Sequence, residues 1–119
     1  MAAWKIVCLV LYALGMATGQ ILFKVAADGT AGTTGFLPAL LANKPFWLAV
    51  LLYGALTVLW VWLLTKVPLV YAYPFATLAF VFTPLLAHVV LREGFGAGYV
   101  VGSALLIGGL LVIAWTAQV

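Results

Sequence analysis

The sequence contains very few charged residues. Of its 119 residues, five are Lys or Arg and two are Asp or Glu, whereas 68% are hydrophobic. A soluble domain normally carries about a quarter charged residues on the surface that faces water. This shortage excludes a soluble enzyme, a disordered chain and a nucleic-acid binder that depends on a basic patch. The net charge of +3 comes from scattered cations and does not indicate a nucleic-acid partner.

Carboxylates and cysteine are the scarcest of the reactive residues. Asp28 and Glu93 are the only two carboxylates, and both lie near expected loops. The single Cys8 cannot form an intrachain disulfide, and no Cys/His/Asp cluster is available to hold a metal. The sequence also lacks a plausible Ser/His/Asp or Cys/His set and a phosphate-cradling loop motif. We therefore expect neither an enzyme nor a bound cofactor.

The sequence instead contains long apolar runs. Four stretches, roughly 4–26, 45–65, 68–91 and 96–117, each reach the ~20 residues that a helix needs to cross the hydrocarbon. Backbone N–H and C=O groups inside lipid must bond to one another, which a helix achieves within a single run. We do not expect a membrane barrel, because its strands are only ~10 residues long and these runs are much longer. We predict an all-α integral membrane protein with a single domain of four transmembrane helices. The first run is not a signal peptide, because three more follow it without a good cleavage site.

The connections between the runs differ in length. The second and third connections, 66–68 and 92–96, are short, whereas the first, 27–44, is long. It contains an apolar segment, 36–42, which is too short to span and too apolar for open water, so we expect an interfacial or re-entrant turn of helix. The Lys and Arg residues at the ends of the expected spans are divided almost equally between the two sides of the membrane, two against three. The positive-inside rule therefore gives no orientation.

The first run carries the most informative polar residues. Gln20 and Lys24 are four residues apart and share a helix face, which Tyr12 and Met16 continue. An ionisable residue inside a span is costly to desolvate and is therefore a functional candidate. The alternative is that Lys24 lies at the helix end and extends its ammonium to the interface. Position alone slightly favours the anchor, whereas Gln20 favours a polar pocket.

The third run contains Pro74 and Pro84. Each proline removes a backbone donor, and a freed carbonyl persists at membrane depth only where a partner or water reaches it. Broken helices often form substrate sites in transporters, so Tyr71 and Tyr73 beside Pro74 are binding candidates. A simple packing kink is an equally good interpretation.

His88 and Arg92 lie four residues apart at the end of the third run. A lone histidine is more often a hydrogen-bonded structural residue than a ligand. Arg92 could bind an anion, and an interfacial ion pair with Glu93 is the simpler interpretation.

Small residues recur at four-residue spacing in the last run. Gly98 and Gly102, with the adjacent Ser103, form a face that allows close helix approach in lipid. This face could pack internally or form a dimer seam. Four short helices enclose little volume, so we predict a dimer interface.

Three motifs resemble those of a known superfamily: 19–24 (GQILFK), 71–75 (YAYPF) and 91–93 (LRE). With four expected helices, nearly the whole chain resembles the drug/metabolite transporter superfamily. Its four-helix members are the small multidrug resistance family and the aminoarabinose-phosphoundecaprenol flippase subunits. The drug exporters carry a first-helix glutamate eight residues before the lysine, and that position here is Met16. The groups that remain suit an anion such as a lipid phosphate, and the long first connection also resembles the flippase subunits.

The resemblance implies a flippase for an undecaprenyl-phosphate-linked sugar in the bacterial inner membrane. Its partners would be a polyprenyl-phosphate glycolipid, membrane lipids and a second copy, or a paralogue in a heterodimer. Transport would proceed without proton antiport. The alternatives are an exporter of small solutes and an accessory subunit that stabilises another membrane protein.

On the flippase hypothesis, Lys24 pairs with the phosphate while Gln20 and Tyr73 donate hydrogen bonds to the phosphate or sugar. Arg92 serves as an entry or exit contact. The candidate substrate contacts as a set are Lys24, Gln20, Tyr73, Arg92, Tyr71 and His88.

Overall fold

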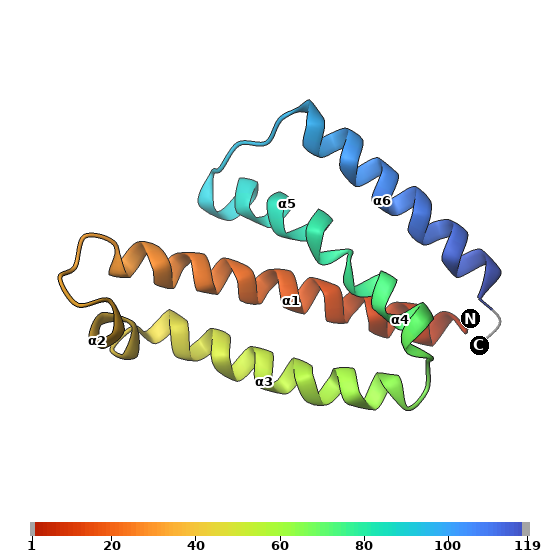
Figure 1. Cartoon of the computed structure of the whole chain (residues 1–119), viewed down its shortest axis with the longest axis horizontal. Helices are drawn as coiled ribbons and strands as arrows, with labels where there is room; N and C mark the ends of the chain where they lie inside the picture. The colour runs from red at the N-terminus through yellow and green to blue at the C-terminus, as the bar shows by residue number, and fades with distance from the viewer. Residues whose placement is uncertain (1, 118–119) are drawn as a thin grey trace.

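The computed structural model describes residues 2–117, and this part of the chain is helical with no strand. Four segments are long and apolar enough to cross a membrane, one of them formed by two consecutive helices. The predicted all-α fold with four transmembrane helices is therefore confirmed (Figure 1). The helices are α1 (Ala3–Thr30), α2 (Phe36–Leu41), α3 (Lys44–Leu64), α4 (Leu69–Ala76), α5 (Ala79–Leu91) and α6 (Ala97–Thr116).

Helix α1 continues four residues beyond its expected end at 26 and finishes at Thr30. The added turn brings Asp28 onto the same face as Lys24, and the Thr30 hydroxyl donates to the Ala27 carbonyl at 2.9 Å. These local interactions stabilise a turn whose Gly and Thr content favours a loop. At 1.5 Å per residue, 28 residues measure roughly 42 Å, whereas the hydrocarbon is about 30 Å thick. An untilted α1 therefore projects beyond the hydrocarbon.

Helices α1 and α3 run antiparallel and lie side by side (Figure 1). Two glycines of α1 permit this close approach. A Cβ atom at Gly19 would lie 2.3 Å from the Tyr53 ring, and one at Gly15 would lie 2.9 Å from Leu56. In lipid, helix association depends on such contact, because the surrounding acyl chains are as apolar as the side chains.

The long first connection contains α2, which lies across the end of the α1–α3 pair (Figure 1). Asn43 links α3 to α1: its side-chain oxygen accepts from the Phe46 N–H at 3.1 Å, and its side-chain amide donates to the Ala26 carbonyl of α1 at 3.4 Å. The side chains of Phe36 and Leu37 are 60% and 66% exposed. The expected short helix is present, and its position at the membrane interface stays a prediction.

The third span is broken, as its prolines suggested. Helix α4 ends at Ala76 and α5 begins at Ala79, and between them the backbone bonds close tighter, three-residue turns. Pro84 lacks the N–H that would bond to the Phe80 carbonyl, which weakens the first turn of α5. The Thr77 hydroxyl donates to the carbonyl of Pro74 and thereby satisfies a polar group beside the break.

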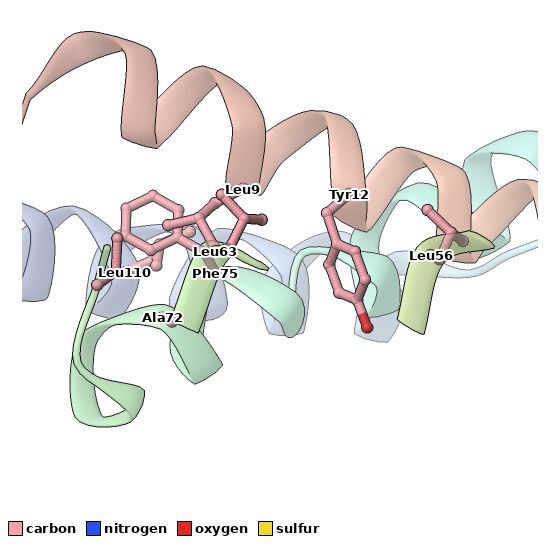
Figure 2. Packing of buried hydrophobic residues seen from close by; sticks show 8 residues of the cluster. Leu9, Tyr12, Leu56, Leu63, Ala72, Phe75 and Leu110 are labelled. Atoms are coloured by element: carbon pink, nitrogen blue, oxygen red, sulfur yellow. The ribbon is translucent and has the colours of Figure 1, made fainter. Parts of the chain in front are cut away.

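The core lies where α4 crosses α1 and α3, toward the end of the molecule that holds both described termini (Figure 1). Leu9 and Leu63 are fully buried, and Phe75 is 2% exposed. Figure 2 shows these side chains close together, with Tyr12 further along α1. Tyr12 stacks on Trp60 at 4.9 Å between ring centroids. The core thus packs one end of the bundle tightly.

Helix α6 is the least packed of the long helices. Leu110 is its one buried residue within the described part. Gly98 and Gly102 have open space where a Cβ would be, and Ser103 carries a buried hydroxyl without a hydrogen-bond partner in the described structure. The predicted interface residues therefore lie on a helix that this chain leaves largely uncovered.

Candidate functional site

A cavity of about 560 Å³ lies between α1, α3 and the broken α4–α5 segment. It begins beyond the core, where Tyr12 and Trp60 form one boundary. Thr77, at the break, and Pro84 lie in its wall, whereas Pro74 does not. The lining residues are Tyr12, Met16, Gln20, Trp60, Tyr73, Ala76, Thr77, Ala79, Phe80, Thr83 and Pro84.

The polar face predicted on the first helix lines this cavity in part. Tyr12, Met16 and Gln20 follow one another at one-turn intervals and all contribute to the wall. Tyr73 reaches the cavity from α4, so two of the predicted substrate contacts, Gln20 and Tyr73, line one hollow. Met16 thus places a thioether, rather than a carboxylate, on the cavity wall.

A hydrogen-bonded chain fixes the side chain of Gln20. Its Nε2 atom donates to the hydroxyl oxygen of Tyr53 on α3 at 2.6 Å. That hydroxyl donates in turn to the backbone carbonyl of Met16 at 3.1 Å. Sequence reasoning missed Tyr53, because only the register of α3 against α1 brings it to Gln20. The small residue at Gly19, which the Tyr53 ring covers, was the available signal that a large side chain packs there.

Lys24 lies one turn beyond Gln20 and does not line the cavity. Its Nζ atom is 3.3 Å from Oδ1 of Asp28, and the two side chains are 50% and 60% exposed. This is the one ion pair within residues 2–117. The pair exists because α1 extends to Thr30, past its expected end at 26.

Tyr71 packs against the core rather than into the cavity. His88, at the far end of α5, has its Nδ1 atom 2.9 Å from the carbonyl oxygen of Glu93. A carbonyl oxygen can only accept, so Nδ1 carries the proton. The His88 ring also packs edge-on against Phe95 at 5.0 Å. This geometry matches the structural interpretation of the histidine.

Arg92 ends α5 in the left-handed conformation, with a φ of 58°. This backbone turn lets the Glu93 N–H donate to the Ala87 carbonyl at 3.2 Å, which closes the helix. The side chains of Arg92 and Glu93 are exposed, and they do not form the ion pair that their adjacency suggested, since Lys24 and Asp28 make the one such pair in the described chain. The Arg92 guanidinium is therefore available to an anion outside the cavity.

The cavity lining is uncharged and mainly apolar, with a few hydroxyl groups and the amide of Gln20. Among its lining residues, all within the described part, none is Lys, Arg, Asp or Glu. Amide and hydroxyl groups can bind a neutral polar group by hydrogen bonds, and Trp60 and Phe80 add apolar faces. Such a lining suits a sugar ring better than a phosphate, whose charge requires a cation or several donors when it leaves water.

A smaller hollow of about 300 Å³ lies between α4 and α6. Tyr73 and Thr77 line both hollows, so α4 forms a shared wall between them. The rest of this second lining is mainly apolar, including Leu105 and Ile113 of α6.

Comparison with curated proteins finds relatives over most of the chain. One is named as a probable 4-amino-4-deoxy-L-arabinose-phosphoundecaprenol flippase subunit ArnE of Pseudomonas fluorescens. It is 34% identical over 107 residues, which cover 89% of this chain and 94% of the relative. A protein of the same name from Sodalis glossinidius is 33% identical over 95 residues, 78% of this chain and 81% of its own. No known family profile and no solved structure matches the chain significantly.

Proposed function

This chain belongs to the family of 4-amino-4-deoxy-L-arabinose-phosphoundecaprenol flippase subunits, and we propose that it is part of a flippase for an undecaprenyl-phosphate-linked sugar. The relatives are named as subunits, which implies a protein partner. The observation that carries the proposal is the uncharged cavity at the break of the third span, whose mainly apolar wall presents the Gln20 amide and several hydroxyl groups. A mostly apolar wall with a few placed hydrogen-bonding groups can bind the faces and hydroxyls of a sugar, and a polyprenyl chain can remain in lipid.

In this proposal the sugar enters the cavity between Gln20 and Tyr73, while the phosphate stays outside it. Lys24 lies one helical turn from Gln20, so one lipid headgroup can reach both residues. The phosphate oxygen would replace the Asp28 carboxylate as the partner of the Lys24 ammonium. Arg92 lies at the same end of the bundle as Lys24, where α5 and α1 finish (Figure 1). Both cations would then attract the phosphate in one headgroup layer.

We further propose that α6 packs against a second protein chain in the inner membrane. A second copy of this chain is the preferred occupant, through Gly98, Gly102 and Ser103. The support is the open space at both glycines and the low burial of α6. A paralogous chain on the same face is the alternative, and mass measurement of the crosslinked complex distinguishes the two.

Liposome transport tests the proposed function. The complex, extracted from membranes in mild detergent, is reconstituted with undecaprenyl phosphate bearing 4-amino-4-deoxy-L-arabinose in one leaflet. We expect the sugar to become accessible from the other side faster than in protein-free liposomes. Export of small cations without movement of this lipid would contradict the proposal and favour a solute exporter. Activity that requires a different membrane protein, and proceeds equally without this chain, would identify an accessory subunit.

A further inference from the structure

We propose that Tyr53 is a positioning residue that makes Gln20 present its side-chain carbonyl oxygen to the cavity. The cavity would thereby select a sugar head group that carries hydrogen-bond donors, hydroxyl or ammonium. This inference rests on the proposed function, and it adds the chemical feature of the substrate that the cavity recognises. Neither Tyr53 nor this orientation of Gln20 follows from the helix face that the sequence displays.

The direction of each hydrogen bond follows from the groups involved. The Met16 backbone carbonyl can only accept, so the Tyr53 hydroxyl must use its single proton there, at 3.1 Å. The Tyr53 oxygen is then left as an acceptor, and the Gln20 atom 2.6 Å away must be the amide nitrogen. The reversed amide would bring two acceptors together. The Gln20 carbonyl oxygen therefore keeps both lone pairs free, beside one remaining N–H.

Packing holds this chain of hydrogen bonds in place. The Tyr53 ring lies directly over Gly19, where a Cβ atom would be 2.3 Å from its Cε2 atom. The ring also contacts Phe23, one turn further along α1, with 5.2 Å between ring centroids. The ring therefore has little freedom to swing away, and its hydroxyl remains aligned with the Met16 carbonyl. A fixed acceptor discriminates better than a mobile one, because no ordering is needed when the ligand binds.

The composition of the cavity lining explains why a ligand that carries hydrogen-bond donors should bind better than a phosphate or a simple cation. The cavity contains no cation to attract a phosphate and no carboxylate to attract a simple cation. The hydroxyl of Thr77, one of the other polar lining groups, already donates to Pro74. An amide carbonyl held in such surroundings accepts from a sugar hydroxyl, or more strongly from an ammonium, since bonds to charged donors are the stronger ones.

The test compares Tyr53→Phe with wild type by native mass spectrometry of the complex in mild detergent. The probes are undecaprenyl phosphate bearing 4-amino-4-deoxy-L-arabinose and bare undecaprenyl phosphate. The variant keeps the ring over Gly19 and removes only the hydroxyl. We expect binding of the sugar-bearing lipid to weaken roughly five- to tenfold, as the loss of one ordered hydrogen bond predicts. Binding of the bare lipid should remain unchanged.

Tyr99→Phe is the matched control, because the Tyr99 hydroxyl also donates to a backbone carbonyl, that of Val81, but does not line the cavity. It should bind both probes as wild type does. Equal binding of the sugar-bearing lipid by Tyr53→Phe and wild type would overturn the positioning role and leave the proposed function intact. Equal weakening for both lipids would overturn the selectivity. A wild-type complex that binds neither probe would instead count against the proposed function.

Discussion

Two side chains near the end of α1, Lys24 and Asp28, form an exposed ion pair that bears on the proposed anion contact. An exposed ion pair of this kind contributes little to stability, typically 0–1 kcal/mol, because water screens it. The small strength of the pair allows exchange: a lipid phosphate can replace the carboxylate at low cost. Lys24 is therefore suited to transient binding rather than to structural support.

Substitution of Lys24 tests this role. Lys24→Ala should abolish lipid flipping in liposomes while expression and complex formation persist, because the proposed phosphate contact is lost. Lys24→Arg should retain part of the rate, since the positive charge remains. Asp28→Asn is the matched variant, and it should not reduce flipping, because it removes the competing carboxylate. A normal rate for Lys24→Ala would mean that the lysine is only an interfacial anchor, and the phosphate site should then be sought at Arg92 and His88.

Gly19 has a structural role that a second substitution can measure. Gly19→Ala should destabilise the protein in detergent by roughly 1–3 kcal/mol, because the new methyl group would collide with the Tyr53 ring. Gly54→Ala, on α3, is the control, since a Cβ atom there meets nothing within 4 Å. Thermal unfolding monitored by circular dichroism compares the two. Similar midpoints for both variants would show that α1 and α3 can separate without cost.

At the scale of elements, α6 differs from the other spans because its own chain covers little of it. Gly102→Leu should weaken association with a second chain, because the larger side chain prevents close helix approach. Val101→Leu, at a neighbouring position that is 60% exposed, provides a control of similar bulk. Crosslinking in native membranes gives the measurement. An unchanged fraction of crosslinked dimer in Gly102→Leu would place the interface on another helix.

The elements also show what the sequence can and cannot predict here. Lipid leaves a spanning chain few options, so apolar length alone predicted four helices. The two prolines indicated a disturbed third span, but left open whether it is broken or only kinked. Helical spacing correctly grouped Tyr12, Met16 and Gln20 on one face. The end of α1 was harder, because the ion pair between Lys24 and Asp28 forms only if the helix already continues. The partnership of Gln20 with Tyr53 depends on interhelical register, which single-helix periodicity does not contain.

At the scale of the whole molecule, the distribution of charge predicts how transport is driven. Asp28, in the last turns of an α1 that exceeds the hydrocarbon thickness, is outside the cavity, and no carboxylate lines the cavity. We therefore predict transport driven by the gradient of the lipid-linked substrate, without proton antiport. In reconstituted liposomes, the flipping rate should be the same with and without a pH gradient across the membrane. A rate that collapses when the gradient is dissipated would contradict this prediction.

The overall dimensions add a constraint of a different kind. The Cα atoms extend over 53 × 36 × 18 Å, and a single helix with its side chains is already about 10 Å across. The chain is thus a slab about two helices thick along its shortest dimension, and it does not form a closed channel by itself. A sugar that lies against one face of this slab has acyl chains or another protein on its opposite side. We therefore expect the sugar to meet, during its passage, surfaces that this chain does not supply.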